Sequence, residues 1–339
     1  MNNKANNCLT FEKIAEIKDF MDNKTNKIMV VNHRKMDGDA IGSAYAFGKV
    51  GEKKGKEVRY FSEDLPSSDF DFLNMDIKFE TKVPKDYKPD VIVCLDTAGI
   101  EQLGSIYTEN KKLFEKTKVF VIDHHYSNPC FGDYNVVFTN KSSTCEIVYD
   151  LLFEHDCEQY VDEQMATMLL MGIITDTNSF FNTNSSSRAM EVAGLLMGYG
   201  ARHQDIILNL FKKKPFNRLK LWGKLLEGIK QSEDGKYVWT TITNDLFLST
   251  KTTTDDTSGF IDEFLSTING AKVVFLLYEL GGNKIKGSFR SRDDNYNVYK
   301  FCELFGGGGH PRASGFTKEK TSIYELETEV LGKLKEFFN

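Results

Sequence analysis

Short apolar runs, each followed closely by an acid or a histidine, dominate the first half of the chain. The runs 28–31, 91–95 and 118–122 have the length and composition of buried strands, and the helix-like segment 40–47 follows the first of them. An amphipathic helix is also expected at 10–21. This alternation of helices and strands predicts the α/β class, with a mainly parallel sheet flanked by helices.

The polar residues that follow these runs predict a metal site. Ligands of such sheets bind beyond the carboxyl ends of the strands, so these residues are expected in one crevice. A further apolar segment, 162–174, reads as a buried helix or a helix that runs into a strand, and it ends near another acid. Six side chains match the ligand demand of two divalent ions: His33, Asp37, Asp39, Asp96, His124 and Asp176. Without thiolates, the set favours two Mn²⁺ ions, with Mg²⁺ or Co²⁺ as alternatives.

The second half of the chain predicts a smaller α+β domain. Its expected elements are a strand at 237–242, an amphipathic helix at 258–268, a hairpin of strands 271–280 and 284–290, and helices at 298–305 and 321–338. The segment between the two patterns is helical and basic, which suggests a connector. We therefore expect a first domain at 1–190, a helical linker at 191–222 and a second domain at 223–339.

Composition narrows the possible partners. The 339 residues are 40% hydrophobic and 27% charged, and the formal net charge is −6. An acidic chain is not expected to coat long nucleic acid, although metal ions and local arginines can attract a small anionic substrate. No apolar run approaches the ~18–20 residues of a membrane span, and the N-terminus lacks an apolar signal core. No membrane partner is therefore expected, and the cytoplasm is the expected compartment.

Four motifs in the first half resemble those of the DHH phosphoesterase superfamily. They are His33-Arg-Lys-Met-Asp37-Gly-Asp39, Leu95-Asp96-Thr97, Asp123-His-His125 and Gly172-Ile-Ile-Thr-Asp176-Thr. In the second half, Gly287-Ser-Phe-Arg-Ser-Arg292 and Phe305-Gly-Gly-Gly-Gly-His310 resemble the DHH-associated domain of the nanoRNase/pAp-phosphatase (oligoribonuclease) branch. The resemblance covers nearly the whole chain in order. It implies a DHH catalytic domain at 1–190 and a DHH-associated, substrate-binding domain at 223–339.

The same resemblance implies a role for each candidate in the first domain. One ion would be held by His33, Asp37 and Asp96, and the other by Asp39, Asp96, His124 and Asp176. Asp96 would therefore bridge the two ions. Asp123 would orient a neighbouring histidine. His125 would contact the scissile phosphate and protonate the leaving oxygen, with ring packing beside His124 as the alternative.

The second domain would bind the rest of the substrate. The implied binding residues are Arg290, Ser291, Arg292, Gly307, Gly308, Gly309 and His310. Arginines offer bidentate phosphate contacts, and glycines let the backbone approach a ligand closely. Arg312 is equally compatible with a surface role. Gln102 stands where relatives often carry an arginine, which leaves the ranking of substrates open. Phe180-Phe181 could stack on bases but fits core packing better.

The resemblance implies an Mn²⁺-dependent phosphodiesterase that degrades RNA of two to about five nucleotides to 5′-mononucleotides. It also implies possible 3′-phosphatase activity on adenosine 3′,5′-bisphosphate (pAp) and a possible homodimer. The alternative is a phosphodiesterase for cyclic di-AMP or pApA, which needs the same chemistry. A RecJ-like single-strand exonuclease would require a more basic surface. A non-catalytic nucleotide-binding regulator would be expected to have lost ligands, and all six are present.

Overall fold

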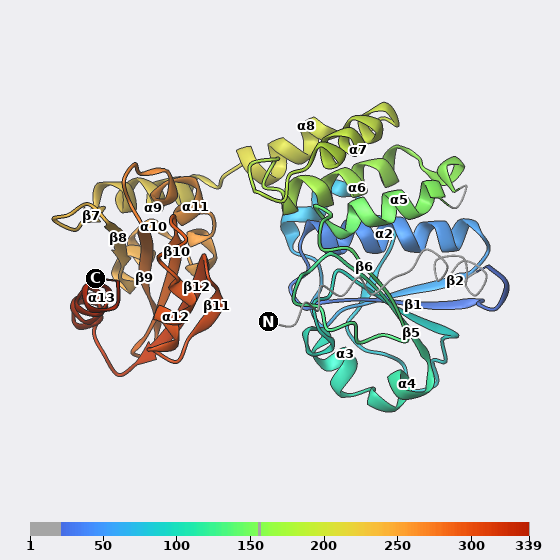
Figure 1. Cartoon of the computed structure of the whole chain (residues 1–339), viewed down its shortest axis with the longest axis horizontal. Helices are drawn as coiled ribbons and strands as arrows, with labels where there is room; N and C mark the ends of the chain where they lie inside the picture. The colour runs from blue at the N-terminus through green and yellow to red at the C-terminus, as the bar shows by residue number, and fades with distance from the viewer. Residues whose placement is uncertain (1–21, 155–156, 339) are drawn as a thin grey trace. The chain divides into compact units, whose positions relative to one another are not determined.

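The computed structural model describes residues 22–154 and 157–338, and the chain divides after Lys213 into two compact units (Figure 1). The predicted helix at 10–21 lies outside the described residues. Within them, no helix is both long enough and apolar enough to cross a membrane. The predicted 191–222 segment is helical at both ends. Leu196 packs in the core of the first unit, whereas Leu221 and Trp222 pack in the core of the second.

The first unit is built on a six-stranded sheet in the order β3-β2-β1-β4-β5-β6, in which every neighbouring pair is parallel. The strands are β1 (Lys27–Asn32), β2 (Glu57–Phe61), β3 (Phe79–Glu80), β4 (Val91–Leu95), β5 (Lys118–Asp123) and β6 (Tyr134–Val137). The apolar runs of the sequence form the central strands because helices cover both of their faces. The predicted α/β fold with a mainly parallel sheet is confirmed.

Successive residues of the central strands point into two different cores. In β1, Val30 belongs to the core that contains residues of α2 (Gly38–Lys53), α5 (Thr144–Glu154), α6 (Glu163–Asp176) and α7 (Ser187–Gly198). Its neighbour Val31 faces the opposite layer, with α3 (Ser105–Thr108) and α4 (Lys111–Lys116). Figure 1 shows α2, α5 and α6 on one side of the sheet and α3 and α4 on the other.

Helix α6 settles one ambiguity of the sequence. The segment is helical from Glu163 onward, and Asp176 is the last residue of α6 rather than a residue at a strand end. Asp162 caps the helix by accepting from the backbone N–H of Met165. All residues from Met165 to Ile174 are buried, because the sheet-facing helices surround α6, so the segment lacks a clear helical period.

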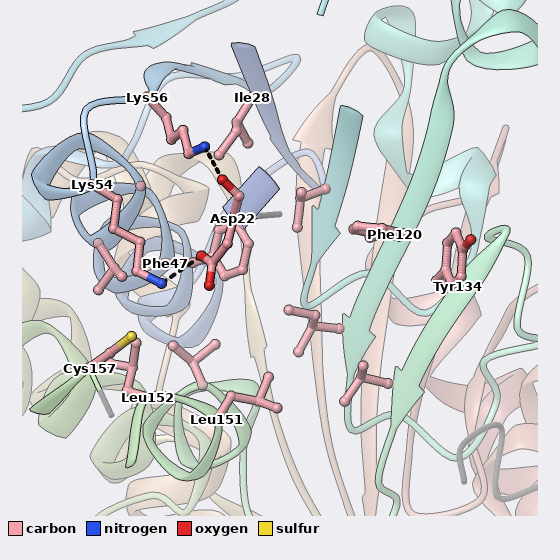
Figure 2. A pocket seen from close by; sticks show the side chains of 16 residues that line it. Asp22, Ile28, Phe47, Lys54, Lys56, Phe120, Tyr134, Leu151, Leu152 and Cys157 are labelled. Atoms are coloured by element: carbon pink, nitrogen blue, oxygen red, sulfur yellow. Dashed lines mark hydrogen bonds and ion pairs between the residues drawn. The ribbon is translucent and has the colours of Figure 1, made fainter. Parts of the chain in front are cut away.

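Shorter helical segments complete the first unit. They are η1 (Ser68–Leu73), η2 (Ile100–Leu103), η3 (Glu158–Tyr160), α8 (His203–Ile206) and the π-helical η4 (Ile207–Lys212). An apolar cavity of about 110 Å³ lies between α2, α5 and the sheet (Figure 2). Lys54 and Lys56 bond to Asp22 beside it. None of the candidate site residues lines this cavity.

The second unit contains a mixed six-stranded sheet in the order β11-β12-β10-β9-β8-β7. Its strands are β7 (Lys230–Gln231), β8 (Tyr237–Ile242), β9 (Val273–Gly281), β10 (Lys284–Ser291), β11 (Gly308–His310) and β12 (Ala313–Glu319). Only β8 and β9 pair in parallel. The predicted smaller α+β domain is confirmed, although the sequence did not predict β11 or β12.

Helices cover both faces of this sheet. Helices α12 (Val298–Glu303) and α13 (Ile323–Phe337) enclose an aromatic core with Phe275 and Phe289. On the other face lie α9 (Phe216–Glu227), α10 (Asn244–Thr250), η5 (Thr254–Thr257) and α11 (Phe260–Glu263). The single amphipathic helix predicted at 258–268 is wrong in detail. The chain forms α11 and then the separate segment η6 (Leu265–Thr267), because Phe264 leaves the helical region.

Candidate active site

The loop from β1 to α2, together with the first turn of α2, presents three of the six candidate ligands. Asp37 is the N-cap of α2, and its Oδ1 accepts from the backbone N–H groups of Asp39 and Ala40, both at 3.0 Å. His33 follows the end of β1, and its Nδ1–H donates to the carbonyl of Arg34 at 2.7 Å. This hydrogen bond leaves the His33 Nε2 free to bind an ion.

Asp39 is held by the start of a second helix. Its Oδ2 accepts from the backbone N–H of Thr144 at 2.6 Å, and its Oδ1 accepts from that of Cys145 at 2.8 Å. Thr144 also donates its hydroxyl to the Oδ1 of Asp96 at 3.0 Å. The N-terminus of α5 therefore fixes two acids from other segments, and its partial positive charge favours their ionised forms.

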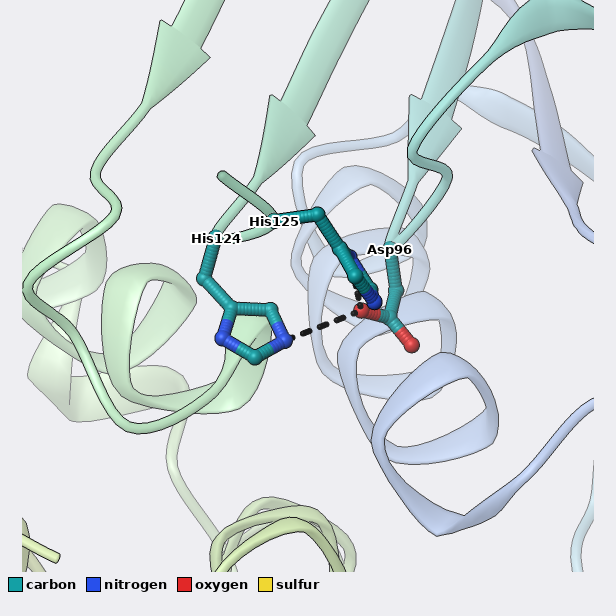
Figure 3. A group of neighbouring side chains, drawn as sticks. All are labelled: Asp96, His124 and His125. Carbon is teal, nitrogen blue, oxygen red and sulfur yellow. Dashed lines mark ion pairs between the residues drawn. The ribbon is translucent and has the colours of Figure 1, made fainter. Parts of the chain in front are cut away.

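Asp96 faces two sides of the cluster at once. Its Oδ2 lies 3.7 Å from the Nε2 of His33, and its Oδ1 lies 3.7 Å from the Nε2 of His124. Figure 3 shows the rings of His124 and His125 directed at this carboxylate from the neighbouring strand end. Asp96 has φ +53°, an uncommon conformation for a residue other than glycine. Such an arrangement is the one that a bridging carboxylate needs.

The surroundings of the His124 Nε2 show whether a cation fits between the candidate ligands. This nitrogen is buried, and it has no hydrogen-bond partner within the described part of the chain. Carboxylate oxygens of Asp176, Asp96 and Asp39 surround it at 3.6, 3.7 and 4.0 Å. These separations are too long for hydrogen bonds, but ligands that each lie about 2.1 Å from a shared ion are separated by about 3–4 Å. The residues fit a divalent cation between them.

Three groups of side chains converge closely enough to hold an ion. They are His33, Asp37 and Asp96; Asp39, His124 and Asp176; and Asp96, His124 and His125. The structure thus brings together all six predicted ligands. It also places His125, predicted as a catalytic residue, beside the same carboxylate. Whether these residues bind metal in solution stays a prediction.

Two asparagines position Asp176. Asn184 donates to the Asp176 Oδ2 at 3.1 Å, and Asn182 donates to the backbone carbonyl of Asp176 at 3.1 Å. Between α6 and Asn182, three successive residues, 178–180, have positive φ. This left-handed segment turns the chain back toward the carboxylate. Phe180 packs against the core, as expected, whereas Phe181 is 77% exposed.

Asp123 orients His125 rather than His124. Its Oδ1 lies 2.7 Å from the His125 Nδ1, and its Oδ2 accepts from the Nδ2 of Asn128 at 2.6 Å. Burial alone would lower the pKa of His125, but the hydrogen bond and the negative charges of Asp123 and Asp96 outweigh it and raise that pKa to about 9. His125 is therefore a proton donor at neutral pH.

The buried carboxylates repel one another, and this repulsion shifts their pKa values. Burial and the charge of Asp96 raise the pKa of Asp39 well above its usual range. Burial would also raise the pKa of Asp96, but the ion pair with His33 and the charges of His124 and His125 lower it to about 2. Burial raises the pKa of Asp176 to about 6. This conflict between like charges is the one that bound cations relieve.

In the second unit, one predicted arginine is already paired. Arg290 donates through Nε and Nη2 to the two carboxylate oxygens of Asp262 in α11, at 2.9 and 3.1 Å. Ser291 is buried and donates to the carbonyl of Asp293 at 2.6 Å. Arg312 pairs with Asp294, which agrees with a surface role. Arg292 is exposed, and its backbone N–H donates to the carbonyl of Lys272.

The glycine run lies along the edge of the sheet. Strand register aligns His310 with Ala313, and Ala313 with Arg290. Because paired residues of antiparallel strands project to the same face, His310 and Arg290 share one face. A Cβ at Gly307 would lie 2.3 Å from the carbonyl of Gly315, so close packing against β12 alone demands glycine there. A Cβ at Gly308 would meet open space.

The sequence did not reveal several residues that hold the site. Thr144, Asn128 and Asn184 carry no signal in the sequence that would identify them as residues of the site. Each acts through a contact between segments distant in the sequence, such as the bond from Thr144 to Asp39. Their roles depend on the tertiary fold.

The class defined by this architecture is an α/β protein with a carboxylate–imidazole centre at the end of a parallel sheet, followed by a second mixed-sheet unit. Residues 27–173 match the model of the DHH family N-terminal domain, and residues 234–339 match the DHHA1 domain. The chain therefore contains a DHH domain followed by a DHHA1 domain.

Curated relatives extend along nearly the whole chain. A bifunctional oligoribonuclease and PAP phosphatase NrnA from Thermus thermophilus is 28% identical, over 96% of this chain and 94% of that protein. The cyclic-di-AMP phosphodiesterase GdpP from Geobacillus thermodenitrificans is 25% identical, over 93% of this chain but only 48% of that protein. Both are relatives of the chain.

One solved structure matches the fold closely. It is an exopolyphosphatase-related protein from Bacteroides fragilis, with a TM-score of 0.88 and 21% sequence identity over 98% of both chains. At this identity the match concerns the fold alone.

Proposed function

We propose that the chain is a metal-dependent phosphodiesterase that degrades short oligoribonucleotides to 5′-mononucleotides and removes the 3′-phosphate of pAp. The observation that carries the proposal is the partnerless, buried His124 Nε2 inside a ring of three carboxylates. The name of the Thermus thermophilus relative supports the substrate class. Both reactions break a P–O3′ bond, so one centre serves both.

The six converging side chains, His33, Asp37, Asp39, Asp96, His124 and Asp176, would hold two divalent ions, which we propose to be Mn²⁺. Bound ions of this kind supply Lewis acidity and an activated water. The chain's own contribution is geometric. Asp96 spans the two halves of the cluster, while the N-terminus of α5 keeps Asp39 in place.

His125 supplies the proton for the leaving oxygen. Asp123 accepts from its Nδ1–H, which leaves the other ring nitrogen to donate. The raised pKa, about 9, keeps the ring protonated at neutral pH. In the second domain, Arg292 and His310 are exposed and would grip the far nucleotide. The domain boundaries at 190 and 222, the cytoplasmic location and the homodimer stay predictions.

A product time course tests the proposal. The chain with Mn²⁺ is offered ApA, pApA, pAp, cyclic di-AMP and a 20-nucleotide RNA, beside the variant Asp96→Ala. Rapid release of mononucleotides from dinucleotides, absent in the variant, is expected. No hydrolysis of any of these substrates would refute the proposal. The fastest turnover on cyclic di-AMP would favour the alternative, which the relative GdpP supports.

A further inference from the structure

The arginines of the chain differ in whether their side chains have a partner. Six of the eight are paired with carboxylates: Arg59, Arg188, Arg202, Arg218, Arg290 and Arg312. Among residues 22–154 and 157–338, only Arg34 and Arg292 have a guanidinium without a hydrogen bond or ion pair. Arg292 is already a predicted substrate-binding residue. Arg34, which was not predicted to bind anything, directly follows the candidate ligand His33.

The backbone of Arg34 is fixed on both sides. Its N–H donates to the carbonyl of Gln102 at 2.9 Å, and its carbonyl accepts from the Nδ1–H of His33 at 2.7 Å. The next residue, Lys35, has φ +55°, and its N–H donates to Asp64 at 3.1 Å. An exposed guanidinium therefore extends from a rigid loop beside the metal centre. An arginine side chain without a partner in the protein, on a backbone that is held in place, is preorganised to bind an anionic ligand.

The candidate metal centre has no excess positive charge that could bind a second anionic group. Asp37, Asp39, Asp96, Asp123 and Asp176 carry five negative charges when ionised. Two divalent ions would supply four positive charges against these five. The centre can then bind the attacked phosphate through the ions, but it has no positive excess for a second phosphoryl group. Arg34 supplies one positive charge at the edge, with the planar fork that suits phosphate.

We infer that Arg34 binds a second phosphoryl group of the substrate, one that is not attacked, so that the chain prefers nucleotides with a 5′-terminal phosphate. The inference rests on the proposed function and refines its substrate class. Charge-assisted hydrogen bonds from arginine to phosphate correspond to a gain of about 10- to 100-fold in affinity. pApA is then a better substrate than ApA, and pAp is held better than adenosine 3′-monophosphate.

The test uses two probes that cannot be cleaved. They are the deoxy-dinucleotide of adenosine with a methylphosphonate linkage, made with and without a 5′-phosphate. Affinities are measured by calorimetry with the Mn²⁺-loaded full chain. The variants are Arg34→Gln, Arg34→Lys, Arg292→Gln and Lys82→Gln, the last of which removes one exposed charge elsewhere in the same unit. Melting temperatures verify that each variant is folded.

In the wild type and in Lys82→Gln, the 5′-phosphate should strengthen binding about tenfold or more. Arg34→Gln should abolish this gain and leave the affinity for the unphosphorylated probe unchanged, while Arg34→Lys keeps part of it. A gain that persists in Arg34→Gln, an equal loss for both probes, or a gain removed only by Arg292→Gln would overturn the assignment. Because the probes are not hydrolysed, the result is independent of whether the chain is a phosphodiesterase, which the product time course decides.

Discussion

In the first unit, Asp39, Asp96 and Asp123 are buried at the carboxyl end of a parallel sheet, whereas in the second unit Arg292 and His310 lie exposed on a mixed sheet. Buried like charges are tolerated only with counter-charges close by, so the first arrangement suits bound cations. Exposed charges are solvated, so they need no counter-charge within the protein and are free to bind a ligand. We therefore expect chemistry and recognition to be separable, and variants in each unit test this expectation.

The largest expected effect is in the buried cluster. Asp96→Ala removes the carboxylate that faces both His33 and His124, and should lower kcat on bis-p-nitrophenyl phosphate with Mn²⁺ by at least about 1000-fold, equivalent to about 4 kcal/mol of barrier. Asp86→Ala, an exposed acid of the same unit, serves as the control and should keep full activity. If Asp96→Ala retained more than about a tenth of the wild-type kcat, the bridging assignment would be wrong.

Metal removal should affect the stability of the first unit only. Mn²⁺ at 100 times its dissociation constant should stabilise that unit by about 2.7 kcal/mol. Because burial and the charge of Asp96 raise the pKa of Asp176 to about 6 without a cation, metal-free Asp176→Asn should be as stable at pH 7 as the metal-free wild type, or more stable. Calorimetric scans with and without chelator measure both effects. A melting transition indifferent to Mn²⁺ would contradict the metal centre.

The exposed surface should show a smaller, substrate-dependent effect. Arg292→Ala and His310→Ala should lower kcat/KM on a dinucleotide about tenfold or more, and change hydrolysis of bis-p-nitrophenyl phosphate little, because that ester lacks a second nucleotide to bind. Arg312→Ala, in the same unit and paired with Asp294, is the matched control. Equal losses on both substrates would place Arg292 and His310 in the chemistry itself.

The smallest effect concerns pH. In the metal-free protein, the pKa of His125 is raised to about 9 above the usual value of 6.5. Its contribution to stability is therefore fully present below pH 6.5 and is lost as the pH rises through about 9. The difference in denaturation midpoint between wild type and His125→Gln should shrink between pH 6 and pH 10. A difference that grows with pH would mean that the ring is held neutral.

Sequence reasoning succeeded where the signal was local. The runs 28–31 and 91–95 identify buried strands, and the residues after them converge because parallel strands end at the same edge. It failed where an outcome depends on tertiary contacts. The all-round burial of α6 concealed whether Asp176 ends a helix or a strand. The pairing of Arg290 with Asp262 depends on α11 packing over the sheet, which no sequence spacing reveals.

The left-handed segment 178–180 has a consequence for how the sequence can vary. A right-handed continuation of α6 would carry the chain away from Asp176 by about 1.5 Å per residue. Asn184 could then no longer donate its hydrogen bond to the Asp176 carboxylate. Asparagine, the residue at 178, accepts this backbone at modest cost, and glycine would accept it freely, but a β-branched residue would not. None of these three positions is a candidate ligand. Substitutions there should nevertheless be selected against, as are substitutions of residues that contact the centre.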